Sequence, residues 1–94
     1  GSITIVNTGT ISGKSDAIVT GSGTSTTRIT NYGEIAGGAG GIDQLLGDAV
    51  IINYGAISGQ SYAYDGAADI DTLSNFGSIT GGVIARGGDD IIKN

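Results

Sequence analysis

The fold of this chain is decided by one nine-residue stretch, Ile51-Ile52-Asn53-Tyr54-Gly55-Ala56-Ile57-Ser58-Gly59. Its pattern, I-x-N-x-G-x-I-x-G, occurs in four complete copies, with Leu at the first position of the last copy; they are residues 5–13, 29–37, 51–59 and 73–81. The asparagines of these copies are 24, 22 and 22 residues apart, and Ile92-Lys93-Asn94 opens a fifth copy 19 residues later. Self-similarity at a fixed period is typical of repeat architectures, so the chain is read as one repeat domain, residues 1–94.

A period of about 22 residues with short alternating segments predicts a β-solenoid, in which each repeat forms one coil of short strands. The apolar residues favour strands, because fifteen Ile and four Val stand against three Leu. Leucine-rich repeats have a similar period, but they need a ladder of Leu that three residues cannot supply. We therefore expect an all-β parallel β-helix of about four coils of 22 to 24 residues.

Stacked coils lie about 4.8 Å apart, so equivalent residues of successive coils form columns. Two buried columns are expected from the motif: Ile11, Ile35, Ile57 and Ile79, and Ile5, Ile29, Ile51 and Leu73. A third column is expected five residues after the last Gly of the motif, at Ile18, Ile42 and Tyr64, with Ile84 arriving two residues early in the fourth coil.

The asparagine column is expected to be a structural ladder at a corner of the coil; its members are Asn7, Asn31, Asn53 and Asn75. An Asn amide there can bond both the turn backbone and the Asn of the next coil. The glycines two residues later are expected to allow a positive φ or a close approach of backbones; they are Gly9, Gly33, Gly55 and Gly77.

The residues between each Asn and Gly form an outward column in which Thr8 is followed by Tyr32, Tyr54 and Phe76. Adjacent aromatic rings in such a column can stack and stabilise the surface. The same column can also serve as a contact strip for sugars or for a partner protein, and both interpretations stay open here.

The composition excludes several classes of protein. The chain has 19 Gly and no Pro, which excludes collagen and proline-rich linkers, and 38% apolar against 14% charged residues argues against disorder. It contains no Cys and no His, and its net charge of −5 would repel nucleic acid. The longest aliphatic run, residues 49–52, is too short to span a membrane.

Carboxylates are the remaining candidates for site chemistry. Several Asp precede the motif asparagines by four or five residues, and we expect them to be neighbours in successive coils; they are Asp48, Asp71, Asp89 and Asp90, with Asp65 and Asp69 on the preceding turn. They can form a solvated acidic edge, a calcium site, or the acid residues of a carbohydrate-active enzyme.

Calcium has a second sequence signal around Asp43. Residues 38–46 resemble the nonapeptide G-G-x-G-x-D-x-U-x of calcium-binding repeat toxins, without its second Gly. The predicted metal residues are therefore Asp43, Asp48, Asp71, Asp89 and Asp90, with no cofactor required by the fold and no catalytic residue assigned.

The pattern N-x-G-x-I-x-G at 22-residue spacing resembles the right-handed β-helix repeats of bacterial type V secreted surface proteins. These are autotransporter passenger domains and filamentous-haemagglutinin-like adhesins. The resemblance covers residues 3–94 and implies a right-handed coil, export to the cell surface or the medium, and no catalytic residue within the repeat.

The expected function is that of a structural extracellular β-helix, acting as adhesin stalk, surface matrix or filament-forming module. The chain is either a segment of a longer array or a subunit that stacks head to tail, with 91–94 of one copy meeting 1–4 of the next. Host or matrix glycans and proteins are the other expected partners. The alternative is a carbohydrate-active or carbohydrate-binding β-helix that uses the Asp and aromatic columns.

Overall fold

The computed structural model describes residues 2–20, 26–45, 47–66, 71–84 and 91–93. The strands in these ranges form three parallel sheets, and each sheet takes one strand from each coil in turn. Sheet A consists of β1 (Ser2–Asn7), β4 (Thr26–Asn31), β7 (Ala49–Asn53), β10 (Asp71–Asn75) and β13 (Ile91–Lys93). Sheet B consists of β2 (Thr10–Gly13), β5 (Glu34–Gly37), β8 (Ala56–Gly59) and β11 (Ser78–Thr80). Sheet C consists of β3 (Asp16–Thr20), β6 (Gly40–Gln44), β9 (Tyr62–Asp65) and β12 (Val83–Ile84).

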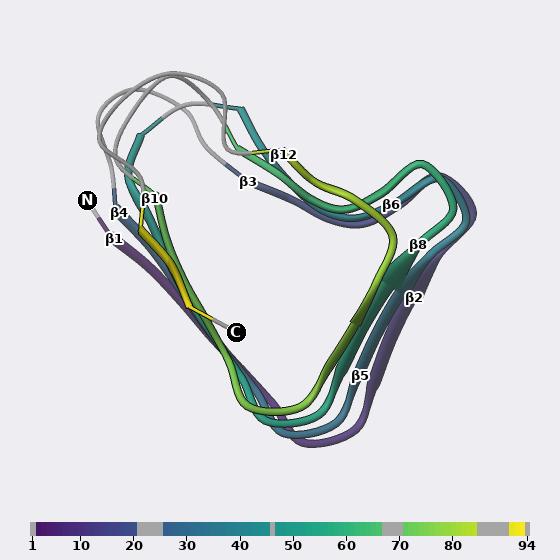
Figure 1. Cartoon of the computed structure of the whole chain (residues 1–94), viewed down its shortest axis with the longest axis horizontal. Helices are drawn as coiled ribbons and strands as arrows, with labels where there is room; N and C mark the ends of the chain where they lie inside the picture. The colour runs from purple at the N-terminus through teal and green to yellow at the C-terminus, as the bar shows by residue number, and fades with distance from the viewer. Residues whose placement is uncertain (1, 21–25, 46, 67–70, 85–90, 94) are drawn as a thin grey trace.

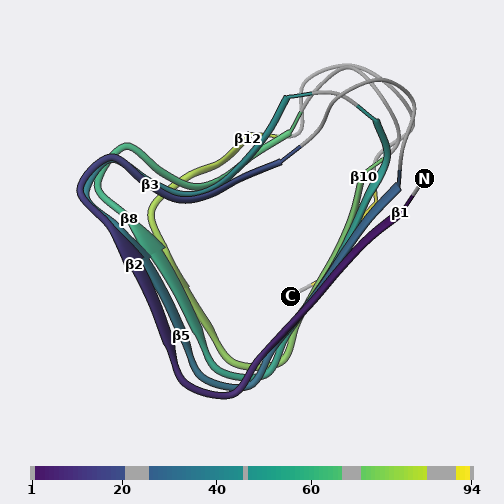
Figure 2. The same ribbon diagram turned by 180° about the vertical axis from the view of Figure 1, so that it is seen from behind.

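The three sheets form the sides of a triangular solenoid (Figure 1). The chain runs along sheet A, turns into sheet B, turns again into sheet C and returns to sheet A one level further on. The winding is right-handed, and Figure 2 shows the same stack from the end that carries β1. The predicted fold class is confirmed: an all-β right-handed parallel solenoid with coil number close to the expected four. Within the described ranges, no helix is long and apolar enough to cross a membrane.

The register between coils follows the sequence motif. Asn7 pairs with Asn31, Asn31 with Asn53, and Asn53 with Asn75. Both predicted motif columns are confirmed, because Ile29, Ile51 and Leu73 are paired in sheet A, and Ile35 and Ile57 are paired in sheet B. The side chains of these residues are at most 2% exposed. Burying a side chain of this size stabilises the fold by roughly 1.5–3 kcal/mol, so these columns are the main apolar support of the stack.

The third predicted column is confirmed in three coils and wrong in the fourth. Ile18 pairs with Ile42, and Ile42 with Tyr64, but Tyr64 pairs with Val83. Ile84 instead pairs with Asp65 and is 39% exposed. The fourth coil turns early because Gly81 adopts a φ of 112°, a left-handed conformation that favours glycine. This early turn moves Val83 into the core position.

Candidate contact surfaces on the solenoid

The Asn corner, where sheet A turns into sheet B at each motif asparagine, is held by a continuous ladder of side-chain amides. Asn7 Nδ2 donates to Asn31 Oδ1 at 2.9 Å, Asn31 Nδ2 to Asn53 Oδ1 at 2.9 Å, and Asn53 Nδ2 to Asn75 Oδ1 at 2.8 Å. Asn31 and Asn53 are fully buried. The structure therefore brings all four predicted ladder residues together, in one chain of bonds that runs through every coil.

The amides of Asn7, Asn31 and Asn53 also bond the backbone of two coils. Asn53 Nδ2 lies 3.2 Å from the carbonyl oxygen of Gly55 in its own coil and 3.0 Å from that of Ser78 in the next coil. Asn31 makes the equivalent bonds to Gly33 and Ala56. Buried polar groups are costly when they lack partners, so this bonding fixes both the shape of the corner and the register between coils.

The glycines of the Asn corner are needed for a close approach of two backbones. A Cβ atom at Gly33 would overlap the carbonyl oxygen of Gly9 in the preceding coil, and Gly55 and Gly77 have the same relation to Gly33 and Gly55. At Gly9, in the first coil, a Cβ atom would meet nothing within 4 Å. None of these four glycines has a positive φ, so close approach is the reason for glycine at Gly33, Gly55 and Gly77.

The aromatic column stands on the outside of the Asn corner. The rings of Tyr32 and Tyr54 are stacked with centroids 5.1 Å apart and planes within 5°, and Tyr54 and Phe76 are stacked at 5.2 Å and 12°. The three side chains are 56%, 49% and 70% exposed. Because Tyr54 has a ring against each of its faces, it presents mainly its ring edge and hydroxyl to solvent. Phe76 is covered by Tyr54 on one face.

The described carboxylates do not form the single column that the sequence predicts. Asp71 is only 2% exposed and lies in register with Ala49 and Thr27, whose positions face the interior of the coil. Asp48 precedes β7 and is exposed. Asp89 and Asp90 lie outside the described residues. Sequence spacing alone placed Asp48 and Asp71 together, whereas the alternation of side chains along β10 turns Asp71 inward with Leu73 and Asn75.

Asp43 has an acidic neighbour in the next coil, which is Asp65 and not one of the other predicted metal residues. The two residues are paired between β6 and β9, on the outer face of sheet C. Among the residues that the structure describes, no three acidic side chains are grouped closely enough to hold a metal ion. Calcium binding at these residues stays a prediction.

A second polar contact joins coils one and three at the Gly corner, where sheet B turns into sheet C. The hydroxyl of Tyr62 donates to Asp16 Oδ1 at 2.7 Å across 46 positions of sequence. Gly40 lies between them in register, and a Cβ atom there would overlap the Tyr62 ring. The bond to Asp16, followed by burial and the charges of Asp43, Asp16 and Asp65, raises the pKa of Tyr62 above its ordinary value.

This contact was not foreseen from the sequence, although a signal for it exists. Asp16, Gly40 and Tyr62 each lie three residues after the last Gly of their motif copy, so the alignment of the repeats puts them in one column. The same alignment puts Asp43 beside Asp65. Both neighbour pairs could have been found by extending the aligned repeats beyond the motif itself.

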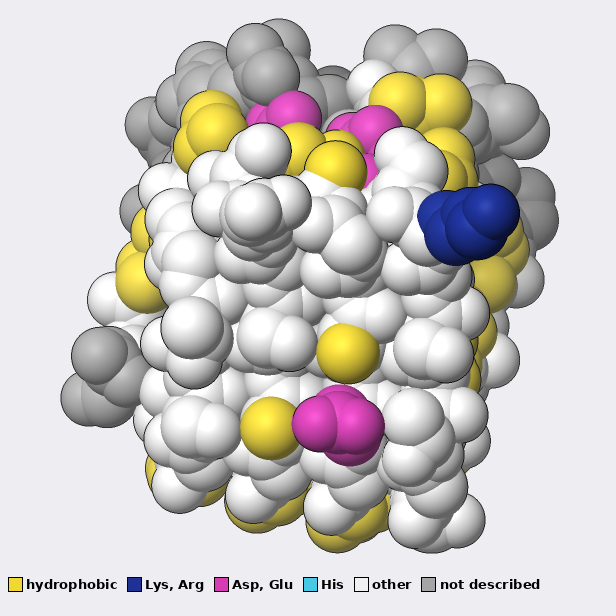
Figure 3. Space-filling view, turned by 90° about the vertical axis from the view of Figure 1, so that its right-hand side faces the viewer, with side chains coloured by type: hydrophobic (Ala, Val, Ile, Leu, Met, Phe, Trp, Pro, Cys, Tyr) yellow, Lys and Arg dark blue, Asp and Glu magenta, His cyan; other side chains and the backbone are white. Residues whose placement is uncertain are grey.

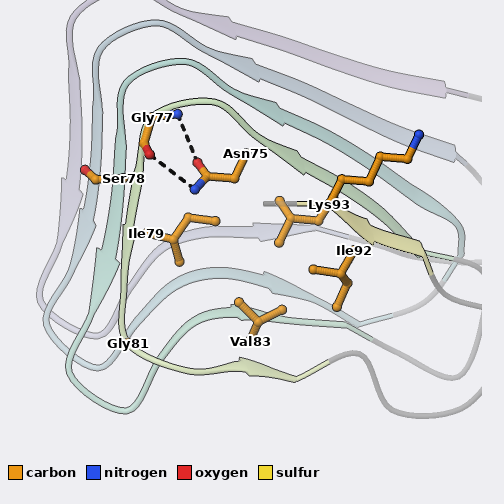
Figure 4. A pocket seen from close by; sticks show the side chains of 9 residues that line it. Asn75, Gly77, Ser78, Ile79, Gly81, Val83, Ile92 and Lys93 are labelled. Atoms are coloured by element: carbon orange, nitrogen blue, oxygen red, sulfur yellow. Dashed lines mark hydrogen bonds between the residues drawn. The ribbon is translucent and has the colours of Figure 1, made fainter.

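A pocket of about 420 Å³ opens at the end of the solenoid that carries β13 (Figure 4). Sheet A has one described strand more than sheets B and C, and the pocket lies at this step. Its lining comes from the last coil and β13: Leu73, Asn75, Gly77, Ser78, Ile79, Gly81, Val83, Ile92 and Lys93. The pocket is therefore an exposed end of the core and not a groove on the side of the stack.

The outer face of sheet B is flat and carries small side chains (Figure 3). Its outward positions are Thr10, Ser12, Glu34, Ala36, Ala56, Ser58, Ser78 and Thr80. This face offers hydroxyl groups and a single carboxylate, with no bulky apolar side chain.

Comparison of the chain with protein-family models, with curated proteins and with solved structures found no match. What is established is the fold, a parallel β-solenoid built from the N-x-G repeat.

Proposed function

We propose that this chain is a structural module of an extracellular or bacterial cell-surface protein, acting as an adhesin stalk, a surface-matrix element or a filament-forming unit. The observation that carries the proposal is the uninterrupted Asn ladder, which holds four coils in one register. A stack built in this way is rigid and grows by one level for each repeat. The resemblance of the N-x-G motif to type V secreted surface proteins supports the same function.

The aromatic column is the proposed contact strip for host or matrix glycans and proteins. It combines three exposed rings with two phenol hydroxyls along one edge of the stack. Aromatic side chains of this kind are common at contact surfaces because one end is apolar and the other forms hydrogen bonds.

The location of the protein on the cell tests this proposal most directly. Antibodies raised against the purified chain should label intact cells that produce it, and external protease should remove the label. As a control, a protein of the cytoplasm of the same cells, probed with its own antibody, should stay unlabelled and undigested. Labelling that requires permeabilised cells would contradict the proposal.

Head-to-tail association of copies is part of the same proposal, and Gly9 offers a sharp test. The equivalent glycine of the second coil, Gly33, faces the backbone of the coil before it, so a side chain at position 9 would project from the β1 end of the stack. Within the described residues a Cβ atom at Gly9 has no neighbour within 4 Å, so such a side chain has room. The variant Gly9→Arg should therefore keep the wild-type melting temperature while blocking docking at this end.

Analytical ultracentrifugation over a range of concentrations and electron microscopy give the readout. Filaments in the wild type and monodisperse particles for Gly9→Arg are the expected pair of results. A wild type that stays monomeric at every concentration would remove filament formation from the proposal and leave the stalk function standing.

The alternative function is a carbohydrate-active or carbohydrate-binding β-helix. It is favoured by the pairing of Asp43 with Asp65 on the outer face of sheet C, since clustered carboxylates are the catalytic groups of glycoside hydrolysis. Release of new reducing ends from a panel of polysaccharides, lost in Asp43→Asn and kept in Asp48→Asn, would support an enzyme. Glycan binding without turnover, lost in Tyr54→Ala, would support a binding module.

A further inference from the structure

The two tyrosines of the aromatic column have an arrangement that bears on their redox chemistry. Tyr32 and Tyr54 are one coil apart, their ring planes are 5° from parallel and their centroids are 5.1 Å apart. Both side chains are about half exposed, at 56% and 49%. We propose that this pair is a site of oxidative modification, at which a one-electron oxidant joins the two rings into dityrosine.

The backbone beneath the rings holds the pair in register. Asn31 and Asn53, the residues just before the two tyrosines, are joined side chain to side chain at 2.9 Å, and Tyr54 N donates to Asn31 O at 2.7 Å. Since both rings leave equivalent positions of adjacent coils, each carbon ortho to a hydroxyl lies near its counterpart. Two reacting groups that are already held together have a high effective concentration, so coupling within the molecule outpaces encounters between molecules.

The chemistry balances with a peroxidase and hydrogen peroxide as oxidant. Each phenol loses one electron and one proton and becomes a phenoxyl radical. The two radicals form one carbon–carbon bond between ortho carbons, and each ring regains its hydroxyl by transferring the proton from that carbon to oxygen. In sum the pair loses two hydrogens, and one hydrogen peroxide is reduced to two water molecules.

The other aromatic side chains of the described structure do not offer the same pair. Tyr64 is 2% exposed and lies out of reach of an enzyme. Tyr62 has Gly40 as its register neighbour in the preceding coil and donates its hydroxyl to Asp16. Phe76 stacks on Tyr54 but has no hydroxyl from which a phenoxyl radical could form.

A bond between Tyr32 and Tyr54 would tie the second coil to the third in a chain that has no cysteine. It would restrict the unfolded chain in the way that a disulfide does. The modification would thus lock the second coil to the third, and the two rings would tilt out of their parallel stack to form the bond.

The test uses the folded chain, dilute, with peroxidase and hydrogen peroxide, followed by digestion with a protease that cuts after acidic residues. Cleavage after Asp16, Glu34, Asp48 and Asp65 places Tyr32 and Tyr54 in different peptides, 17–34 and 49–65. We expect these two peptides to be recovered as one species lighter by two hydrogens, in monomeric protein, with dityrosine fluorescence. The denaturation midpoint of the oxidised protein should rise.

Tyrosine-to-phenylalanine variants assign the bond. Tyr32→Phe and Tyr54→Phe should each abolish the linked peptide, while Tyr62→Phe, which also removes one hydroxyl, should leave its yield unchanged. Each variant keeps a ring in place, and an unchanged circular dichroism spectrum shows that it folds.

Three results would overturn the proposal. They are cross-links only between molecules, a linked peptide that persists in Tyr54→Phe, and equal yields from folded and denatured protein. The last would mean that the stacked geometry contributes nothing.

Discussion

The two corners on either side of sheet B use glycine for different reasons. At the Asn corner, glycine makes room for the backbone of the preceding coil, as at Gly55. At the Gly corner, a Cβ atom at Gly13 or Gly59 would overlap a carbonyl oxygen three residues ahead in its own coil. The first corner is thus shaped by the contact between coils. The second is shaped by the local path of the turn together with contacts between coils, since a Cβ atom at Gly38 would overlap the carbonyl oxygen of Lys14 and one at Gly81 that of Gly59.

The two corners also differ in whether they vary in length. The Asn corner has the same number of residues in all four coils, because the ladder bonds and the close backbone contact recur at each level. The Gly corner is shorter in the fourth coil, where Val83 takes the place that Tyr64 holds in the third. The side-chain ladder of the Asn corner recurs in equal coils, whereas the Gly corner, whose glycines also serve the local path of the turn, permits a change of length.

Removing an interior member of the Asn ladder should have the largest effect. Asn53→Ala removes the bonds to Asn75, Gly55 and Ser78 and takes the acceptor from Asn31. We expect the free energy of unfolding to fall by about 3 kcal/mol, because several buried polar bonds are lost together. Asn75→Ala, at the partly buried last described position of the ladder, removes a less buried amide and should cost about 1 kcal/mol. If guanidinium denaturation gave equal losses of free energy of unfolding for Asn53→Ala and Asn75→Ala, the ladder would not act as a unit.

Substitution of a glycine at the Asn corner should cause the second-largest loss of stability. Gly55→Ala places a Cβ atom against the carbonyl oxygen of Gly33, and relieving this overlap should cost about 2 kcal/mol. Gly9→Ala, at the same motif position in the first coil, should change the free energy of unfolding by less than about 0.5 kcal/mol. Comparable losses in thermal denaturation of the two variants would refute the close-approach explanation.

At the Gly corner, loss of the Tyr62 hydroxyl should have a smaller effect. Tyr62→Phe removes the bond to Asp16 and should cost about 1 kcal/mol at pH 7. A double-mutant cycle of Tyr62→Phe with Asp16→Asn measures the coupling energy between the two side chains. Additive losses of free energy of unfolding would mean that they do not interact in solution.

The same bond has a pH dependence with a defined sign. The folded-state pKa of Tyr62 is raised above the ordinary value of 10.0 that applies to the unfolded chain. The stabilisation is therefore fully present below pH 10 and is lost as the pH rises towards the folded-state pKa. The difference in stability between wild type and Tyr62→Phe should shrink above pH 10, and a difference that grows with pH would contradict this assignment.

The smallest change in stability is predicted for a substitution that extends the aromatic column by one ring. Thr8 holds the column position in the first coil, since it follows Asn7 as Tyr32 follows Asn31, the register partner of Asn7. Thr8→Tyr should add a third stacked pair and raise the free energy of unfolding by about 0.5 kcal/mol. Thr10→Tyr, on the outer face of sheet B, serves as control. An equal gain in both variants would attribute the effect to strand propensity.

The sequence was sufficient to predict the columns that repeat. The spacing of Asn7, Asn31, Asn53 and Asn75 predicted a stack, and the Ile positions of the motif predicted its core, because in-register parallel strands place equivalent residues together. Ile84 was misplaced because the length of the last turn depends on one φ angle, at Gly81.

The carboxylates show a second limit of prediction from sequence spacing. Asp48 and Asp71 were grouped by their distance from the next Asn, but the side of the sheet on which a residue lies depends on the parity of that distance. Asp71 is four residues before Asn75 and lies inward like it, while Asp48, five residues before Asn53, does not. The Asp16–Tyr62 bond depends on the absence of a side chain at Gly40, which a search for functional residues overlooks.

The Asn corner also determines how polarity accumulates along the stack. Its side-chain amides donate forwards, from each coil to the next, whereas the peptide groups of the same corner donate backwards, as from Tyr32 N and Gly33 N to Asn7 O. The two sets of dipoles oppose each other at every level. An α-helix gains partial charges at its ends because its peptide dipoles all point one way. At this corner the opposed dipoles offset each other in part, so adding coils builds up less electrostatic end charge here than aligned dipoles would.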